Sequence, residues 1–408
     1  MNHGMAKNHD GEYPRRPMRI GIIAPPWVPI PPPAYGGIER VIDITARGLA
    51  AAGHDVLLYA TGDSTCPVPK AWIYETACTP IGSCPSEVRH VIHAYEAMRA
   101  WGADIVHDHS LVGPLQAARF PELTVVTTNH GPFTEPELGD LYGYVGHDVR
   151  VLAISEHQAA SAVPLEIPVA GVIHHGIDPL DFPMGTGKGD YVAFLGRMVP
   201  DKGVGQAVQL CRAAGVPLRI GAKMREQHEF EYFRKVVEPM LGRDIEYLGE
   251  LGHDDKVALL QDAKALVNPL QWHEPFGMVM IESMSCGTPV IAYRKGAAPE
   301  IIDQGITGVI CDTPGEFVDA LQRIDDLDRD ACRARVENYF SMQRSADEHI
   351  AFYREVIKTR KMRDAIDLRN PAPSAVPPNL TTMPQVASAL NGALPSRKTS
   401  RSEGSPVT

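Results

Sequence analysis

Glu274 and Glu282 are the residues whose type and spacing most directly suggest chemistry. They bracket the start of an apolar segment within NPLQWHEPFGMVMIESMSCGTPVIA (268–292). Eight residues along a helix span about 12 Å, whereas an acid and a nucleophile around one sugar bond stand about 5–5.5 Å apart. The spacing therefore favours contacts with two separate parts of an extended ligand. A solvent-exposed helix position is the alternative interpretation of Glu282.

The segment between the glutamates predicts a helix that starts with free backbone N–H groups. Pro275 suits a first helical turn, because its missing N–H is not needed there, and Gly287 suits the C-terminal cap. The bare amides and the positive end of the helix dipole then form an anion site. No side chain at Gly277 would block a ligand. The amides of 277–279 are predicted to hold phosphates, and the residues predicted to bind the ligand here are Phe276, Gly277, Met278 and Val279.

Two basic residues follow an earlier apolar strand, YVAFLGR, in the loop GRMVPDKG (196–203). Arg197 and Lys202 therefore lie at the carboxyl end of a predicted parallel strand, where open α/β sheets bind their ligands. Two cations there suit a diphosphate, because the charge of a leaving diphosphate has to be stabilised as a sugar bond breaks. Surface-exposed basic side chains are the alternative.

The first half of the chain offers a histidine and two glycines at comparable positions. The strand LTVVTT delivers His130 to its carboxyl end, and Gly36 and Gly37 precede a helix predicted from Ile38 to Gly53. Paired glycines let the backbone approach a phosphate or a sugar. They do not form GxGxxG, so a dinucleotide site is unsupported. A structural histidine and a plain turn are the alternatives.

The stretch EPFGMVMIE (274–282), followed by SCGTPVI, resembles the signature of family 4 retaining glycosyltransferases, which have the GT-B fold. YGGIE (35–39) and GAAPE (296–300) are similar to the family's glycine-rich loop at the interdomain cleft and to its G-x-x-P-E turn. The similarity is firmest over 191–311. It departs at His175, where the family usually has asparagine, so this histidine is left out of the predicted site.

This resemblance implies roles for single residues. Glu274 would lie by the donor sugar, and Glu282 would hold the ribose. His130 would contact the donor sugar from the other domain, and the loop that holds Arg197 looks like the family's phosphate-contacting loop. The implied catalytic residues are His130, Glu274, Arg197 and Lys202, and Gly36 and Gly37 join the donor-binding set.

The expected activity is that of a retaining, hexosyltransferase-like enzyme. It would move a sugar from a nucleoside-diphosphate sugar to an acceptor that is a glycan, a lipid or a small molecule. No carboxylate is placed as a nucleophile, so front-face attack by the acceptor is favoured. Two cations can replace a metal ion, so we expect metal independence and no cofactor. A sugar-nucleotide epimerase or phosphorylase on the same scaffold, or a binding protein that transfers nothing, are the alternatives.

Strands and helices alternate in two blocks separated by a short polar linker near residue 180. This order predicts an α/β protein with two doubly wound, Rossmann-like parallel-sheet domains that face each other across a cleft, the GT-B architecture that the resemblance implies. The base of the donor nucleotide is expected to bind around 248–254. The loops 25–37 and 62–86 are expected to determine which acceptor binds. The predicted parts are a flexible leader (1–17), an acceptor domain (18–180), a donor domain (190–340), a helix crossing back to the first domain (341–362) and a disordered tail (365–408).

Composition excludes several classes of protein. The net charge of −11 argues against nucleic-acid binding, and no apolar run approaches the roughly 20 residues of a membrane span. Contact with a membrane surface is expected only if the acceptor is a lipid. The N-terminus lacks the apolar core of a secretory signal. The seven cysteines contain no C-x-x-C pair, so they are interpreted as reduced thiols in the cytoplasm and not as metal ligands.

Overall fold

The computed structural model describes residues 16–146 and 148–369. The expected flexible leader and disordered tail fall almost entirely outside these ranges, so both stay predictions. None of the helices within the described ranges is at once long enough and apolar enough to cross a membrane.

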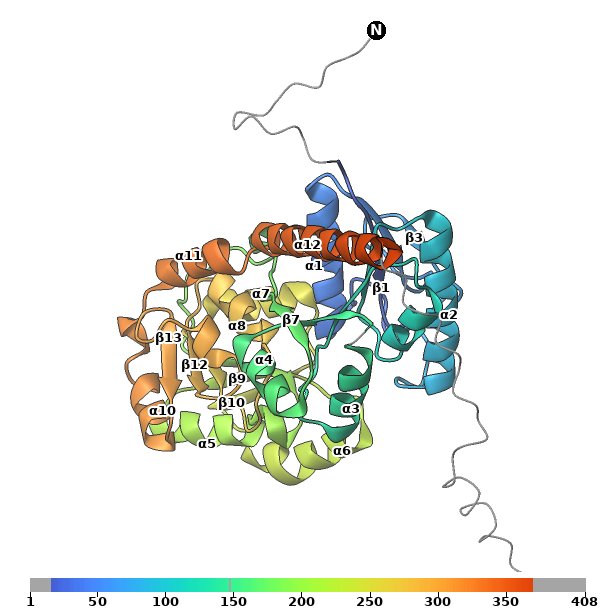
Figure 1. Cartoon of the computed structure of the whole chain (residues 1–408). Coiled ribbons are helices and arrows are strands. Elements are labelled where there is room, and N and C mark those ends of the chain that lie inside the picture. The colour runs from blue at the N-terminus through green and yellow to red at the C-terminus, as the bar shows by residue number, and fades with distance from the viewer. Residues whose placement is uncertain (1–15, 147, 370–408) are drawn as a thin grey trace, which may run out of the picture. The chain divides into compact units, whose positions relative to one another are not determined.

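Seven parallel strands form the first sheet (Figure 1). Their sequences are short apolar runs such as RIGII and VVTT, which are typical of strands buried on both faces. The first strand of the chain pairs on both sides, so the order of strands reverses beside it. In spatial order the strands are β3 (Lys70–Ala71), β2 (Asp55–Tyr59), β1 (Arg19–Ile23), β4 (Ile105–Asp108), β5 (Val125–Thr128), β6 (Arg150–Ala153) and β7 (Val169–Val172).

Six parallel strands form the second sheet. Its first strand in the sequence, β8, takes the place that β1 has in the first sheet, because it pairs on one side with β9 and on the other with β11. The order of strands therefore reverses here as well. In spatial order the strands are β10 (Ile245–Gly249), β9 (Leu218–Lys223), β8 (Val192–Arg197), β11 (Leu266–Asn268), β12 (Val290–Tyr293) and β13 (Gly308–Cys311).

Helices alternate with the strands in both halves (Figure 1). The prediction of two doubly wound parallel-sheet α/β units is therefore confirmed. In the first half the helices are α1 (Gly37–Ala51), α2 (Cys84–Trp101), α3 (Pro136–Val145) and α4 (Glu156–Ala162). In the second half they are α5 (Val204–Ala214), α6 (Gln227–Tyr232), α7 (His253–Asp262), α8 (Met278–Ser285), α9 (Ala298–Ile301), α10 (Pro314–Leu321) and α11 (Arg329–Tyr339).

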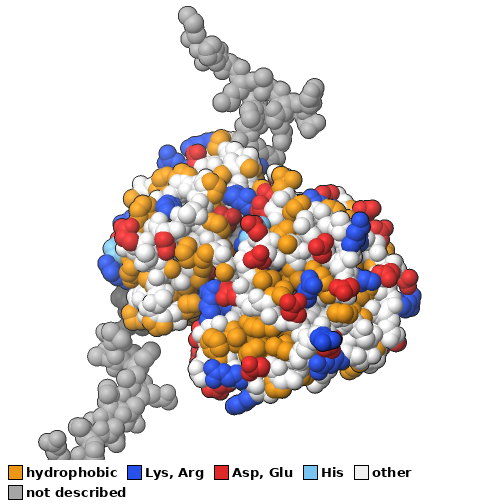
Figure 2. Space-filling model, turned by 180° about the vertical axis from the view of Figure 1, so that it is seen from behind, with side chains coloured by type: hydrophobic (Ala, Val, Ile, Leu, Met, Phe, Trp, Pro, Cys, Tyr) orange, Lys and Arg blue, Asp and Glu red, His pale blue; other side chains and the backbone are white. Residues whose placement is uncertain are grey.

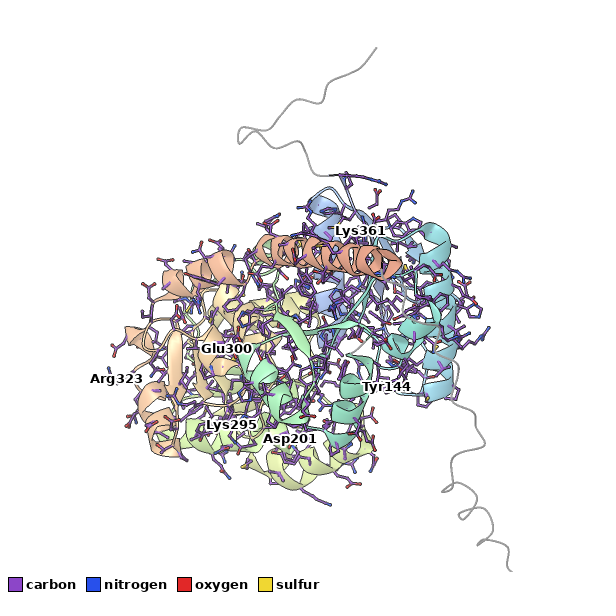
Figure 3. The ribbon with its side chains drawn as sticks, in the orientation of Figure 1. Tyr144, Asp201, Lys295, Glu300, Arg323 and Lys361 are labelled. Carbon is purple, nitrogen blue, oxygen red and sulfur yellow. The ribbon has the colours of Figure 1, made fainter. Side chains whose placement is uncertain are left out.

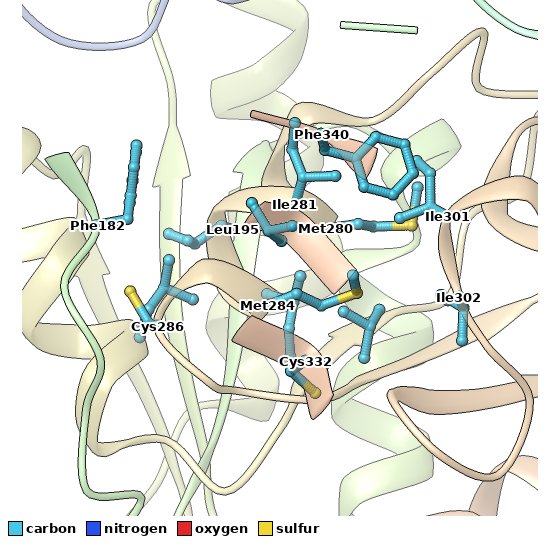
Figure 4. Close-up of a cluster of buried hydrophobic side chains, with 14 of the residues drawn as sticks. Phe182, Leu195, Met280, Ile281, Met284, Cys286, Ile301, Ile302, Cys332 and Phe340 are labelled. Carbon is cyan, nitrogen blue, oxygen red and sulfur yellow. The ribbon is translucent and has the colours of Figure 1, made fainter. Parts of the chain in front are cut away.

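The short helix α8 is fixed by the core of the second half. Met280, Ile281 and Met284 are fully buried and belong to one apolar cluster with Ile301 of α9 and Phe340 beyond α11 (Figure 4). Burying each such side chain stabilises the fold by about 1.5–3 kcal/mol. This packing holds the N-terminus of α8 next to the carboxyl end of β11, where the chain has just left the sheet.

The last helix, α12 (Met342–Arg369), packs against the core of the first sheet through Ile350, Tyr353 and Val356. The sequence predicted a helix over 341–362, and the observed helix continues into residues assigned to the tail. No glycine or proline interrupts the segment before Pro371, so the backbone has no residue that stops the helix there.

Candidate active site

One cavity of about 520 Å³ is lined from the carboxyl ends of both sheets. Loops after β1, β5, β8 and β11 contribute to it. These strands lie at or next to the two points where strand order reverses, which is where open α/β sheets bind ligands. All of the predicted site residues line this cavity: Gly36, Gly37, His130, Arg197, Lys202, Glu274, Phe276, Gly277, Met278, Val279 and Glu282.

Charged side chains of both signs are interspersed with apolar ones on the face shown in Figure 2. Within the coloured part of that face, no continuous basic patch is visible. Proteins that bind nucleic acids usually present such a patch. Several lysines and arginines also line the cavity, where they lie among carboxylates.

Glu274 is held by two neighbours on the wall of the cavity. Its Oε2 accepts hydrogen bonds from Lys202 Nζ and, at 3.0 Å, from Trp272 Nε1. Lys202 Nζ also lies 4.9 Å from the centroid of the Trp272 ring. The Glu274 and Lys202 side chains are only 16% and 14% exposed, so solvent screens this ion pair weakly. Glu274 Oε1 has no partner among the described residues and is available to a ligand.

Helix α8 begins at Met278, three residues later than the position of Pro275 predicted. Gly277 is the reason, because its φ of 94° is left-handed and breaks the helical path. A Cβ at Gly277 would also lie 2.6 Å from Met280 Cε and 3.4 Å from Glu274 Cγ. Met280 N donates a hydrogen bond of 3.0 Å to Gly277 O, which leaves the backbone N–H groups of Met278 and Val279 without an acceptor within the helix. They lie beside Glu274, so this wall carries both a carboxylate and an anion-binding helix end.

Glu282 lies within α8 and pairs with a lysine that the sequence interpretation missed. Its Oε1 accepts a hydrogen bond of 2.7 Å from Lys256 Nζ on α7. Burial lowers the pKa of Lys256; Glu282 opposes this shift and Arg40 adds to it. The two glutamates therefore bind two different lysines, an arrangement compatible with the prediction that they serve separate parts of one ligand.

Arg197, the last residue of β8, has no carboxylate partner in the described part of the chain. Two other cations around the cavity are paired: Lys223 with Glu229 at 3.4 Å, and Arg225 Nε with Glu250 Oε2 at 3.1 Å. A partly buried guanidinium at a strand end with free donors can bind an anion without first breaking an ion pair. Arg197 is thus the strongest candidate for the first contact with a phosphate.

The turn at 296–300 supports Glu274 from behind. Gly296 has a φ of +57°, and a Cβ there would collide with the backbone of Glu274. Ala297 N donates a hydrogen bond of 3.0 Å to Glu274 O. The two basic residues before this turn point elsewhere, because Arg294 pairs with Asp312 and Lys295 donates to Gln271 O. The G-x-x-P-E turn therefore positions a cavity residue without lining the cavity itself.

His130 belongs to a group of buried imidazoles. Its Nε2 lies 2.9 Å from His109 Nδ1, and its ring stacks on that of His175 with centroids 5.4 Å apart. The ring of His107 lies 4.0 Å from that of His109, and its Nδ1 is 2.6 Å from Tyr353 Oη on α12. His107 and His109 are thus buried beside His130 in the wall of the first half. Helix α12 is thereby connected to the cavity wall.

These histidines are neutral because they are buried. Burial lowers the pKa of His130 and of His349 to about 4, and it lowers the pKa of His107, His109 and His175 well below the usual value. No three or more His, Cys, Asp or Glu side chains within the described ranges are arranged to hold a metal ion. The imidazoles contact the cavity as neutral hydrogen-bonding groups.

His175 and Lys256 are among the cavity residues that sequence reasoning missed. His175 lines the cavity and is 6% exposed; it was set aside because it departs from the family pattern. Lys256 gave no signal, since its position four residues into α7 is ordinary for a lysine. The loop expected to bind the base does reach the cavity, at Glu250, Leu251, Gly252 and His253.

Glu300 links the second half of the chain to the first. Its carboxylate, on the residue labelled in Figure 3, accepts hydrogen bonds of 2.8 Å from the backbone N–H groups of Glu156 and His157, which open α4, and one of 2.7 Å from His174 Nε2. Burial raises the pKa of Glu300, but these hydrogen bonds outweigh it and lower the pKa overall. A charged carboxylate thus joins α9 to the start of α4.

Two family models match the chain in succession. The model of "Glycosyltransferase Family 4" matches residues 35–180, and that of "Glycosyl transferases group 1" matches residues 183–339. A glycogen synthase of Mycobacterium tuberculosis is 26% identical over 69% of this chain and 80% of its own length. An MMP alpha-(1->4)-mannosyltransferase of Mycolicibacterium hassiacum is 26% identical over 79% of this chain and 95% of its own.

A solved structure has the same fold. The Anabaena protein HepE in complex with UDP-glucose superposes with a TM-score of 0.64 at 15% identity, over 84% of this chain and 100% of that one. The two parallel sheets, the successive family models and this structural likeness agree with one another. The chain belongs to the family 4, group 1 glycosyltransferases and has the GT-B fold.

Proposed function

We propose that this glycosyltransferase transfers a sugar from a nucleoside-diphosphate sugar with retention of the anomeric configuration. The observation that carries the proposal is the meeting, in one cavity, of the unpaired Arg197, the Lys202–Glu274 pair and the N-terminus of α8. Cations and bare amides around one point suit a diphosphate. Glu282 lies eight residues after Glu274 in the sequence, at a position that suits contact with the hydroxyls of a ribose.

Each residue then has a distinct task. Arg197, Lys202 and the amides of 277–279 bind the diphosphate and stabilise its growing charge as it leaves. Glu282 accepts hydrogen bonds from the ribose. Glu274 orients the hydroxyls of the transferred sugar through Oε1, and the neutral His130 closes the sugar pocket from the first sheet.

Front-face attack by the acceptor would give retention. Glu274 Oε2 accepts hydrogen bonds from Lys202 and Trp272, which lowers its nucleophilicity and favours attack by the acceptor from the face that the diphosphate leaves. The cations supply the charge stabilisation that a metal ion would give. Activity in EDTA should equal that of the untreated enzyme, whereas a loss restored by Mg²⁺ or Mn²⁺ would contradict this assignment.

The solved relative supports a nucleotide-sugar donor in this cavity. HepE was captured with UDP-glucose on the same fold. In this chain the loop at 250–253 lies on the same cavity as Arg197, so a base, a ribose and a diphosphate have adjacent positions. The likeness shows the fold alone, and the choice of base is left to experiment.

A thermal-shift screen against UDP-, GDP-, ADP- and TDP-sugars tests the proposal. A ligand at 100 times its Kd stabilises the protein by about 2.7 kcal/mol, so at least one donor should raise Tm by several degrees. The same donor should then release its nucleoside diphosphate in the presence of a sugar acceptor. Product analysis separates the alternatives: a phosphorylase would use phosphate as acceptor, and an epimerase would return an altered sugar nucleotide.

Arg197→Ala provides the decisive variant, and Arg294→Ala is its matched control. Both remove an arginine of the second half, but Arg294 pairs with Asp312 outside the cavity. Losing one charge-assisted contact costs about 1.5–3 kcal/mol, so Arg197→Ala should abolish most of the donor-induced shift and Arg294→Ala should keep it. Equal shifts in both variants would place the donor elsewhere. A chain that binds a donor tightly but never turns it over would be a binding protein.

A further inference from the structure

Glu39 is a buried carboxylate of the cavity that the roles above do not use. It lies in the first turn of α1, lines the cavity and is only 8% exposed. Its one hydrogen-bond donor among the described residues is its own backbone N–H. The other glutamates on this cavity each have a cation: Lys202 for Glu274, Lys256 for Glu282 and Arg225 for Glu250. Within the described ranges, Glu39 is therefore the cavity glutamate that lacks a cation.

The Glu39 carboxylate is not sealed from the cavity. Neither of its oxygens is among the buried, unpartnered atoms of the described residues, so at least one oxygen reaches the cavity surface. It folds back under the loop after β1, because a Cβ on Gly36 would lie 2.9 Å from Glu39 Oε2 and 2.6 Å from Pro32 Cβ. The carboxylate thus belongs to the wall formed by residues 25–39.

The Glu39 carboxylate has no cation beside it among the described residues. Burial raises the pKa of Glu39, only its own backbone hydrogen bond opposes the shift, and no described cation contributes. Tyr35 of the same wall, four residues earlier, interacts with the charges of Glu274, Arg197 and Glu282. Arg40 acts on Lys256 and so lies toward Glu282. Glu39 therefore contributes an unpaired carboxylate to this wall.

The rest of this wall is apolar. Pro25, Trp27 and Val28 line the cavity from the loop after β1, and Ile81, 61% exposed, lines it from the segment before α2. Apolar and aromatic side chains with a single well-placed polar group are typical of small-molecule sites. A sugar ring offers both matching surfaces, C–H faces for packing and hydroxyls for a carboxylate.

We propose that Glu39 accepts a hydrogen bond from a hydroxyl of the acceptor while Trp27 and Ile81 pack on its C–H face, so that the acceptor is an uncharged sugar or polyol. This inference rests on the proposed function, since it concerns the second substrate of the same cavity. A phosphorylated acceptor is disfavoured because its charge would be buried against an unpaired carboxylate. Repulsion of the wrong partner in this way is a common source of specificity.

The test compares neutral acceptors with their monophosphates. Glucose, mannose and myo-inositol are each offered beside the corresponding monophosphate, with a donor identified by the thermal-shift screen. The wild type should use at least one neutral compound and prefer it over its phosphate by tenfold or more. Glu39→Gln keeps the size of the side chain and removes its charge. It should raise the acceptor KM about tenfold with little change in donor KM. It should also reduce the ratio of kcat/KM for the neutral acceptor to kcat/KM for its monophosphate.

Trp27→Ala and Glu96→Gln complete the design. Trp27→Ala removes the packing surface and should raise the acceptor KM while donor hydrolysis continues at the wild-type rate. Glu96→Gln neutralises an exposed carboxylate on α2, away from the cavity, and should change nothing. A wild-type preference for the phosphorylated acceptor, or equal losses for donor and acceptor in Glu39→Gln, would overturn the proposal. If no donor is bound or hydrolysed, the proposed function itself fails, which is a distinguishable result.

Discussion

Each of the two signature glutamates has its own lysine partner. Because they lie in different parts of the cavity, we expect their substitutions to change different kinetic constants. Glu274→Gln weakens contacts at the sugar, where positive charge develops in the transition state. It should lower kcat by about 10²-fold while the affinity for the bare nucleoside diphosphate is kept or increased, because Lys202 is released from its ion pair. Glu282→Gln touches the ribose, which changes little during reaction. It should mainly raise the donor KM.

Steady-state kinetics and calorimetry with the bare diphosphate separate the two variants. The diphosphate lacks the transferred sugar, so it reports on Glu282 and not on sugar contacts of Glu274. A control for folding is Tm, which the isosteric Gln changes should lower only slightly. If both variants lose nucleotide affinity equally and kcat survives in Glu274→Gln, the assignment of one glutamate to each end of the ligand is wrong.

Single residues were predictable where a local pattern constrains them. The presence of a helix after Glu274 and the strand-end cations could be placed from the sequence, because short motifs fix them relative to one strand. Lys256 could not, since it reaches Glu282 from a helix that precedes it by more than twenty residues. The same holds for the stacking of His175 on His130, which depends on how β5 and β7 are spaced in the sheet.

At the scale of elements, the turn before α9 positions Glu274 through the backbone. Gly296→Ala introduces a Cβ into the space of the Glu274 backbone and requires a left-handed conformation that alanine disfavours. We expect kcat to fall tenfold or more, with donor KM less affected, because Glu274 shifts while Arg197 stays in place.

Gly305→Ala is the matched control for this change. Gly305 also has a positive φ, of 74°, but an added Cβ would meet no atom within 4 Å. The strained backbone should cost each variant about 1 kcal/mol of stability, and Gly296→Ala should lose more because its Cβ meets backbone atoms of Glu274. Equal kcat values for the two variants would show that the 296–300 turn does not control Glu274.

Helix α8 shows which features of an element could be predicted from the sequence and which could not. A proline and a downstream glycine predicted the helix and its C-terminal cap, and Gly287 does follow the helix with a φ of +73°. The start was placed too early, because only the three-dimensional path shows that Gly277 is left-handed. A helix end defined by a glycine, and not by a proline, leaves the loop at 272–276 free to carry Trp272 and Glu274.

At the scale of the whole molecule, the buried histidines link stability to pH. Their folded-state pKa lies below the unfolded value near 6.5, so the stability they contribute is present above that value and is lost as pH falls toward about 4. The shift to about 4 corresponds to roughly 3 kcal/mol for each of His130 and His349. Asp108 offsets part of this loss, because burial raises its pKa to about 7 and it gains a proton over the same interval.

Melting temperatures measured from pH 7 to pH 4.5 test this linkage. Tm should fall steeply below pH 6.5, and His349→Gln should give a shallower fall, because one titrating ring is removed while a donor for Ser345 O is kept. A solvent-exposed histidine, His93, is the matched control, and His93→Gln should leave the slope unchanged. A Tm that stays constant down to pH 5 would show that these imidazoles are not held neutral.

The overall architecture could be predicted because it follows from alternating apolar strands and amphipathic helices, whose right-handed crossovers allow few topologies. Twice-repeated alternation therefore gave both parallel sheets and the site at their carboxyl ends. This pattern does not predict which distant segments of the chain contact each other. Examples are Glu300 with the start of α4, and Tyr353 of α12 with His107.

The stereochemistry of transfer tests the central claim most directly. The first product formed from an α-linked nucleoside-diphosphate sugar can be followed by ¹H NMR before the anomers equilibrate. In the proposed mechanism, Arg197, Lys202 and α8 hold the leaving diphosphate on one face of the sugar, and the acceptor attacks from that same face. The account predicts that the first product has the α configuration. A first product with the β configuration would contradict it.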